Sequence, residues 1–546
     1  MLLGALCASD KLIAQSNLPF EVHGNFQLDA QYYRPDSLIN APEVPESILS
    51  NGFGNLIISR DRFSAGIRYE SYLNPLLGFD SRYKGSGITY RYASYTVEDL
   101  EITLGNFYDQ FGSGLIFRSY EERSLGIDNA MDGLRVKYNP HPGIYLKGLI
   151  GEQRFFFDKG PGIVRGFDSE FALSEAIKGW GENKTRISLG ASAVSKYQKA
   201  EDPIYKIPSN VLAVAGRTTI SRGGLSFYGE YAYKANDPSL ENATLAFPSG
   251  IYKDGYGAYM NATYTKKGLG ISVSAKHIDN MSFRSDRGAS GNVLSINYLP
   301  SLTKQQTYRL ATLYPYASQS KGETAFQTEI FYNFKKGSVL GGTNGTYIAI
   351  NYSKSANLDT VGTNDGMGYS TNVLKSWSNL FTEFSGSRYF EEASLEIQKK
   401  VNKDLKLILN YIYTVYDQNL TGEGKDTVTA HTAIAEIQYK INKSYSIRGE
   451  LQHLYTQSDR GNWVLGLAEL TISPNWFFAF FDEYNYGNDD PNKRIHYWNG
   501  SMGYTKGANR ISLAYGKQRQ GLLCVGGVCR NVPASNGLSI SITSSF

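Results

Sequence analysis

The sequence lacks long apolar runs and contains few charged residues. No uninterrupted apolar stretch approaches the roughly 20 residues of a membrane-spanning helix, which excludes a helical membrane protein. Charged residues make up 19% of the 546 residues, below the roughly 25% of a typical globular chain. The net charge of +4 is too small to indicate a nucleic-acid-binding surface. Low charge, abundant glycine and only 17 prolines do not suit a disordered chain either.

What the sequence does contain is tyrosine, glycine and a persistent period of two. There are 41 Tyr and 56 Gly. In residues 405–415 one face carries Leu405, Leu407 and Leu409, while Lys406 and Asn410 lie on the other. Such segments recur about two dozen times at near 20-residue spacing, and many are roughly 9–13 residues long, the length of a tilted strand that crosses a bilayer. Tyrosine belongs to the two interfacial girdles of such a barrel.

The connections and the last strand favour a transmembrane barrel over a soluble sheet. Between residues 400 and 537, short and longer connections alternate, as periplasmic turns and external loops do. Residues 537–546 form an amphipathic strand that ends in Phe546, the signature read by the bacterial outer-membrane assembly machinery. We therefore predict an all-β fold: a single antiparallel transmembrane outer-membrane β-barrel of about 20–26 strands with no plug domain. Its expected partners are outer-membrane lipid and the barrel assembly machinery.

The domain organisation predicted from the sequence is simple. Residues 1–14 resemble a truncated signal peptide, which implies export to the outer membrane of a Gram-negative bacterium. A lipoprotein start at Cys7 is an alternative. Residues 15–546 are assigned to the barrel and its long extracellular loops. Because strand pattern begins at Phe20 and no plug precedes it, we expect that the chain is not a TonB-dependent transporter.

Two cysteines lie near the C-terminus. Cys524 and Cys529 are separated by four residues, two of them glycine, so a small closed loop with a disulfide is the expected arrangement outside the cell. Free thiols are the alternative, since two thiols are too few for a structural zinc site. The last strand must run toward the periplasm to present Phe546 there, which places this loop outside.

Three stretches resemble a known family. They are residues 105–129, residues 297–308 and residues 524–536, of which the pattern Cys-Val-Gly-Gly-Val-Cys-Arg-x-Val-Pro is the most specific. Together with the C-terminal strand they resemble an uncharacterised family of Bacteroidetes-type outer-membrane proteins, a domain of unknown function. The resemblance implies location and fold, and it supplies no catalytic residues.

A dense cluster of charges between two predicted strands is the main candidate site. The pore-lining or constriction candidates within the predicted loop at about 109–137 are Arg118, Glu121, Glu122, Arg123, Asp128, Asp132 and Arg135. A charged side chain facing lipid at mid-depth costs about 2–4 kcal/mol, so these residues must face the lumen or the exterior. Folded inward, the loop would narrow a pore. The alternative is a salt-bridged external loop with no solute contact.

The sequence offers no clear catalytic or metal site. Its six histidines show no metal-ligand spacing, and no Gly-x-Ser-x-Gly elbow is present. We expect no enzyme, no cofactor and no metal, although a site assembled from distant strands stays open. The predicted function is a porin-like channel for small polar or charged solutes. The alternative is a non-conducting scaffold barrel in a secretion, assembly or uptake complex, with a surface lipoprotein or other subunit as partner; a barrel hydrolase is third.

Overall fold

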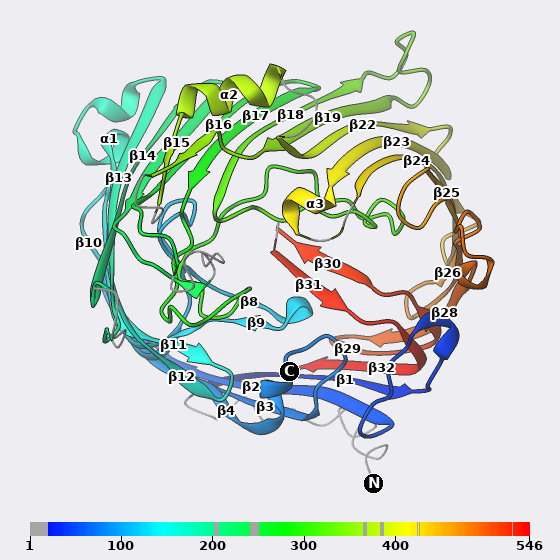
Figure 1. Ribbon diagram of the computed structural model, residues 1–546, viewed down its shortest axis with the longest axis horizontal. Coiled ribbons are helices and arrows are strands. Elements are labelled where there is room, and N and C mark those ends of the chain that lie inside the picture. Colours follow the sequence, from blue (N-terminus) through cyan, green and yellow to red (C-terminus); the bar gives the residue numbers. More distant parts are fainter. Residues whose placement is uncertain are drawn as a thin grey trace.

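The chain forms one closed β-barrel. The computed structural model describes residues 20–200, 207–240, 250–363, 368–382, 387–422, 424, 426–526 and 528–546. Within these residues, 24 antiparallel strands make a single sheet (Figure 1). The sheet closes where β32 (Ser535–Ser545) pairs with β1 (Glu21–Tyr33). The predicted signal peptide, residues 1–14, lies outside the described residues.

Each remaining strand of the barrel pairs with its neighbours in chain order. These strands are β2 (Ile48–Arg60), β3 (Phe63–Asn74), β4 (Gly85–Val97), β5 (Leu100–Phe107), β10 (Met131–His141), β11 (Ile144–Phe155), β12 (Asp158–Ala172), β13 (Thr185–Tyr197), β14 (Asn210–Arg222), β15 (Leu225–Lys234), β16 (Gly255–Lys266), β17 (Leu269–Asp279), β18 (Gly322–Phe334), β19 (Thr346–Ala356), β22 (Arg388–Lys400), β23 (Leu405–Asp417), β24 (Thr427–Lys440), β25 (Tyr445–Thr456), β26 (Trp463–Ile472), β27 (Trp476–Tyr484), β28 (His496–Lys506) and β29 (Asn509–Gln518).

The barrel wall is apolar outside and polar inside. On β23, Leu409 and Tyr411 are 54% and 47% exposed. The residues that alternate with them, Asn410 and Ile412, are 4% and 1% exposed. Exposed apolar residues facing outward and buried polar residues facing the lumen are the arrangement of an outer-membrane barrel, whose outer face meets lipid. The closed sheet pairs its backbone groups internally, as a hydrocarbon environment requires. Among the described residues, no helix is both long and apolar enough to cross a membrane.

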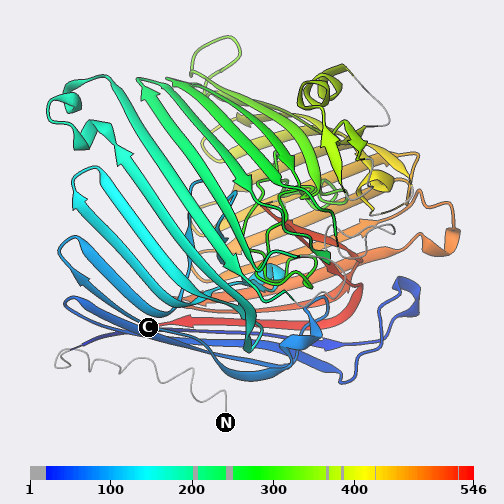
Figure 2. The same ribbon diagram turned by 60° about the vertical axis from the view of Figure 1, so that its left-hand side comes forward.

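The two ends of the barrel differ in their connections. At the end where β1 begins and β32 ends, most neighbouring strands are joined by short turns such as 61–62, 223–224 and 507–508, whereas the connections 173–184 and 335–345 are longer. At the other end, the loop end, several connections are long (Figure 2). The small elements in the connections are η4 (Ser37–Ile39), η5 (Ser81–Tyr83), α1 (Leu173–Ala176), η7 (Trp180–Glu182), β20 (Thr360–Gly362), β21 (Tyr369–Thr371), α2 (Val373–Thr382), α3 (Gln418–Thr421) and η9 (Pro491–Lys493).

Three long connections fold into the lumen, and we call them the inner segments: 108–130, 280–321 and 519–534. Figure 1 shows their small strands within the ring of the wall. The elements of the inner segments are β6 (Asp109–Gln110), β7 (Arg118–Ser119), β8 (Glu121–Glu122), η6 (Arg123–Leu125), β9 (Ile127–Asp128), β30 (Gly521–Val525) and β31 (Val528–Val532). The predicted fold class, which described a barrel with no plug, is therefore wrong in that part: the lumen is occupied by chain from the barrel's own loops. The width of a barrel grows with its strand number, so a 24-strand wall leaves room for them.

Two buried apolar clusters attach the inner segments to opposite parts of the wall. The first joins Phe111, Leu115, Ile116 and Phe117 of segment 108–130, and Met281, Phe283 and Ile296 of segment 280–321, to inward residues of β10–β17. The second joins Leu310, Tyr314 and Tyr316 to inward residues of β22–β26, including Phe390 and Trp463. Segment 280–321 therefore crosses the lumen from one side of the barrel to the other.

The C-terminal residue lies at the seam of the barrel. The backbone N–H and carbonyl of Phe546 exchange two hydrogen bonds with Gly24, each 3.0 Å long. A Cβ atom at Gly24 would stand 2.3 Å from Cζ of the Phe546 ring. Glycine is therefore required here for the terminal ring to lie across the first strand. Recognition of Phe546 by the assembly machinery stays a prediction.

Candidate functional site in the barrel lumen

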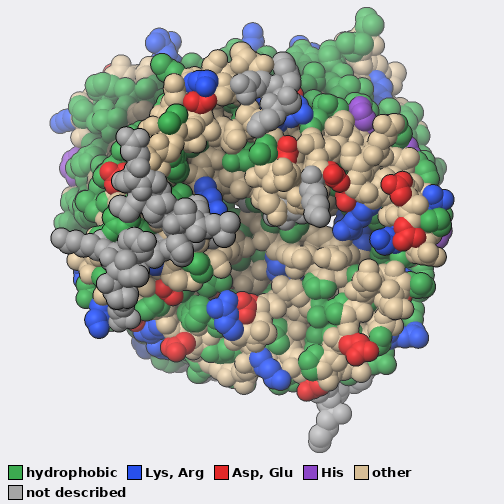
Figure 3. Space-filling view, viewed as in Figure 1, with side chains coloured by type: hydrophobic (Ala, Val, Ile, Leu, Met, Phe, Trp, Pro, Cys, Tyr) green, Lys and Arg blue, Asp and Glu red, His purple; other side chains and the backbone are tan. Residues whose placement is uncertain are grey.

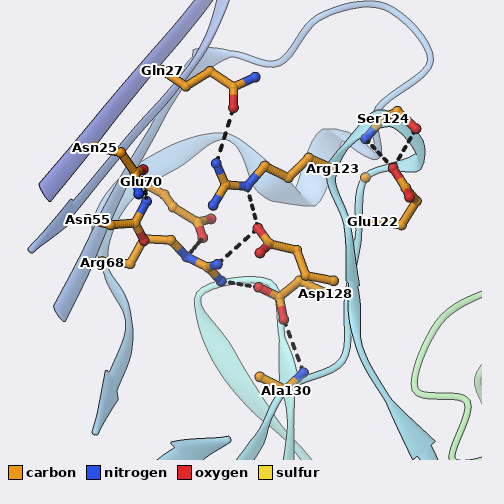
Figure 4. A network of polar contacts seen from close by, with 12 residues as sticks. Asn25, Gln27, Asn55, Arg68, Glu70, Glu122, Arg123, Ser124, Asp128 and Ala130 are labelled. Atoms are coloured by element: carbon orange, nitrogen blue, oxygen red, sulfur yellow. Dashed lines mark hydrogen bonds and ion pairs between the residues drawn. The ribbon is translucent and has the colours of Figure 1, made fainter. Parts of the chain in front are cut away.

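A buried network of charges joins segment 108–130 to the wall. Arg154 of β11 binds both carboxylate oxygens of Glu70 on β3, at 2.9 and 2.6 Å, and reaches Asp128 at 2.6 Å. Arg68 of β3 pairs with Glu70 at 2.7 Å and also with Asp128 (Figure 4). These four side chains are at most 7% exposed. Removal of one partner would leave a buried charge uncompensated, so these pairs break only at high cost.

Three of the residues predicted from the sequence belong to this network. Asp128 is at its centre; Glu121 pairs with Arg68 at 2.9 Å and with Arg123 at 2.5 Å. Arg123 also donates to Gln27 of β1 at 3.1 Å. Sequence reasoning missed the wall partners of this network: Arg68, Glu70 and Arg154. The signal for two of them was present, since Arg68 and Glu70 share one face of a strand on which charges cannot face lipid.

Two predicted residues lie in segment 108–130 but outside the network. The Arg118 guanidinium stacks over the ring of Tyr120 at 4.4 Å and over that of Tyr298 at 4.0 Å. Burial raises the pKa of Tyr120 to about 12, although the charge of Arg118 opposes the rise. Glu122 accepts hydrogen bonds from the backbone N–H of Ser124 at 3.1 Å and from its hydroxyl at 2.6 Å, which caps the short helix η6. Glu122 therefore has a local structural role.

The last two predicted residues lie on strand β10 and face opposite sides. Arg135 pairs in register with the buried Leu149 and binds Glu101 at 2.6 Å, so it faces the lumen. Asp132 shares a face with Leu134, whose register partners Leu104 and Ile150 are exposed on the outer wall. Asp132 therefore lies on the outside, near Lys159 and Arg91, and does not line the lumen. The predicted loop ended too late, because β10 begins at Met131.

A second set of polar contacts holds residues 304–310 against the wall of β22–β27. The Gln306 amide donates to Glu392 at 2.9 Å and the Tyr308 hydroxyl donates to Glu436 at 3.2 Å. Arg309 binds Glu483 at 3.2 Å, and the backbone N–H of Leu310 donates to Gln452 at 2.8 Å. The wall residues are all inward-facing side chains of barrel strands, and they form a row of acceptors along which this stretch lies.

The hairpin of β30 and β31 is the third inner element. Cys524 and Cys529 are joined by a disulfide across it. The hairpin was expected in an external loop; it runs into the lumen instead. There, the Tyr298 hydroxyl donates to the carbonyl of Gly526, and the Asn292 amide donates to that of Cys529 at 2.9 Å. At the base of the hairpin, Arg519 pairs with Glu483 at 2.7 Å, and burial lowers its pKa.

Three pockets surround this hairpin, and it forms a wall of each. The mouth pocket has a volume of about 320 Å³ and contacts the hairpin at Cys529 and Arg530. The wall pocket, about 400 Å³, lies between residues 301–316 and residues 522–526. The central pocket, about 300 Å³, contacts the hairpin at Leu522, Val528 and Cys529. In Figure 3 the loop end of the barrel is hollowed near its centre, with charged side chains around the hollow.

The lumen offers no cluster suited to a metal ion among the residues that the structure describes. No group of three or more His, Cys, Asp or Glu side chains there has the geometry to hold one. His277 on β17 faces the outside of the wall, because it alternates with the inward-facing Lys276 and Ile278, and it bonds the Thr324 hydroxyl at 2.9 Å through Nδ1. Its ring lies 6.3 Å from that of Trp377. These contacts pack helix α2 against the wall.

The family of the chain follows from a match over its whole length. The chain belongs to a family of unknown function, DUF6029, whose family model matches residues 1–546. The resemblance to an uncharacterised family is thereby confirmed at the level of a family without an assigned function. No curated protein matches the chain.

Several solved structures are similar in fold. The translocation pore of the P pilus usher PapC has a TM-score of 0.42 at 10% identity, over 96% of this chain and 99% of that chain. The siderophore receptor PirA from Pseudomonas aeruginosa has a TM-score of 0.39 at 9% identity, over 96% of this chain and 80% of that one. The outer membrane protein opdK from Pseudomonas aeruginosa has a TM-score of 0.36 at 13% identity, over 72% and 94%.

The structures are pores, receptors and channels, and at this level of similarity they describe the fold alone.

Proposed function

We propose that this protein is a diffusion channel of the outer membrane for small polar or charged solutes, narrowed by its own inner segments. The observation that carries the proposal is the position of segment 108–130, which is held inside the lumen by buried ion pairs while polar pockets remain beside it. Charged groups that line a narrowed lumen set the solute preference of a pore. A wall of 24 strands without inner segments would enclose a wide aqueous space.

The charge of the inner segments favours anions. Together, residues 108–130, 280–321 and 519–534 contain nine Lys and Arg and five Asp and Glu. Part of this excess is compensated by wall glutamates: Glu396 pairs with Lys304, and Glu483 pairs with Arg309 and Arg519. Arg118 stacks on tyrosine rings and has no ion pair among the described residues. We infer a modest preference for anions over cations.

Planar-bilayer conductance tests the proposal, with the β30–β31 hairpin as the variable part. The purified protein is expected to give stable stepwise currents, and deletion of residues 522–531 should raise the step size several-fold because that hairpin borders all three pockets. Deletion of residues 488–493, a loop-end connection that lines none of these pockets, is the matched control and should leave the step unchanged. A folded barrel that stays silent both intact and without the hairpin would overturn the proposal.

A partner-binding barrel is the second candidate, favoured by helix α2 at the loop end. Its Leu374 and Phe381 side chains are 84% and 55% exposed, an apolar surface of the kind that docks another protein. A silent barrel whose Leu374→Ser variant loses association with a co-purifying subunit would support this alternative. Association that is unchanged by Leu374→Ser would count against α2 as the docking surface.

A further inference from the structure

The mouth pocket is formed by five separate stretches of chain. Residues 78–83 come from the β3–β4 loop, residues 125–129 from the first inner segment, residues 290–294 from the second and residues 529–530 from the hairpin. Arg154 to Phe156 close the remaining side. A volume of about 320 Å³ is at the lower end of the range of small-molecule sites, roughly 300–1,000 Å³.

Two of the three guanidinium groups in this pocket are neutralised. Arg82 forms a two-pronged pair with Asp80, at 2.6 and 3.0 Å. Arg154 shares the carboxylates of Glu70 and Asp128. Both carboxylates that line the pocket, Asp80 and Asp128, are thus already occupied by arginines. Neither is available to a third cation without loss of an existing pair.

Arg530 is that third cation, and it has no carboxylate partner among the described residues. Its guanidinium stacks on the ring of Phe79 at 4.1 Å, and Nη1 reaches the Leu77 carbonyl at 3.5 Å. Its Nε is buried and makes no hydrogen bond. Burial lowers the pKa of Arg530, as expected for a cation in a site that does not compensate it. The disulfide at the adjacent Cys529 and the stack on Phe79 hold the guanidinium in place.

One side of the pocket wall is apolar. Leu125, Phe155 and Phe156 line it. Phe156 has a φ of 57°, a left-handed conformation that costs a bulky residue energy, and its carbonyl accepts a hydrogen bond from Nε of Arg154 at 2.7 Å. Phe156 is the first residue of the two-residue turn between β11 and β12, and Asp61 and Glu98 have a similar φ in other two-residue turns of the barrel. The ring of Phe156 packs edge-on to Tyr83 at 4.6 Å.

We propose that the mouth pocket binds a small organic carboxylate, with its anionic group on Arg530 and its apolar body against Phe155, Phe156 and Leu125. A guanidinium is the side chain best matched to a carboxylate, because its N–H groups form parallel, charge-assisted hydrogen bonds. This inference rests on the proposed function, since it names the class of solute that the channel would admit. Bound at the loop end, the anion would be concentrated before it passes the constriction.

Equilibrium binding to the full-length protein in detergent tests the inference without reference to conduction. The probes are benzoate and benzamide, which match in shape and differ in charge. We expect benzoate to bind at least tenfold more tightly than benzamide by calorimetry, and Arg530→Gln to remove this difference. Lys493→Gln removes one charge from another loop-end connection and should leave benzoate binding unchanged. Equal binding of benzoate and benzamide to the unmodified protein would overturn the inference, whether or not the variants fold.

Arg530→Lys separates charge from geometry. It keeps the cation and removes the planar fork, so it should retain part of the benzoate preference, whereas Arg530→Gln retains none. Full retention of the preference in Arg530→Gln would also overturn the inference. If the barrel binds benzoate and never conducts, the channel proposal fails while the site stands; if it conducts and does not discriminate benzoate from benzamide, the site fails alone.

Discussion

The two attachments of the inner segments to the wall differ in how completely their charged side chains are buried. Segment 108–130 is held by a buried apolar cluster and by ion pairs whose side chains are almost completely shielded from water. The stretch 304–310, on the opposite wall, is held by Leu310 in the second apolar cluster and by hydrogen bonds to a row of buried, inward-facing side chains, beside the wall pocket. Arg309 there is 36% exposed. In the first attachment both partners of each central ion pair are buried, whereas water reaches Arg309 in the second.

This difference assigns separate roles to the two sides of the lumen. A buried, multiply paired network breaks only at high cost, so it fixes the constriction in position. Contacts made by a partly exposed side chain such as Arg309 contribute less each and open more readily, because local stability varies across a structure. We expect the wall of β22–β27 to be the side along which the lumen widens, and three substitutions test this comparison.

The largest effect is expected from Arg154→Leu. The substitution leaves Glu70 and Asp128 with only Arg68 between them, inside a site that excludes water. We expect a loss of about 3–5 kcal/mol in the free energy of unfolding, measured by urea denaturation in detergent. Arg91→Leu, which removes an arginine that is 56% exposed and paired to Asp132, is the control and should cost about 1 kcal/mol or less. Equal costs for the two variants would remove the distinction between the attachments.

A smaller and more local effect is expected from Leu310→Ala. Leu310 is fully buried in the second apolar cluster, so truncation should cost about 2–4 kcal/mol at that site. Because the rest of segment 280–321 stays attached through the first cluster, we expect faster hydrogen exchange and proteolysis within residues 301–319, with the unfolding midpoint of the barrel nearly unchanged. A large shift of that midpoint would show that the second attachment is as integral as the first.

The smallest effect is expected from Arg309→Gln. Glu483 keeps its pair with Arg519 at 2.7 Å, so no buried carboxylate is left alone and the cost should be about 1 kcal/mol or less. The same substitution removes a cation from the wall pocket and should reduce the preference of the conducting barrel for anions. Unchanged reversal potentials in a salt gradient would argue that solutes pass on the other side of the lumen.

The strands could be predicted from the sequence because apolar and polar side chains alternate along each of them over about ten residues, so no distant contact is needed to recognise a strand. The same alternation shows why Arg68 and Glu70 must face inward. Their partner Arg154 could not be assigned in advance, because it comes from a strand that lies 84 positions along the chain. Likewise, Asp132 was counted with the loop since nothing in its neighbours marks the point at which β10 begins.

The sequence by itself determined the class of the protein: an alternating, tyrosine-rich chain whose apolar faces look outward and whose polar faces look inward. That much follows from local chemistry, since the alternating side chains of each strand match the lipid on one face and the lumen on the other. Only the tertiary structure decided that the lumen is occupied and that the disulfide hairpin lies inside it. It also decided that Arg530 has no carboxylate partner among the residues that the structure describes, because a charge on one segment is paired by residues distant in the chain.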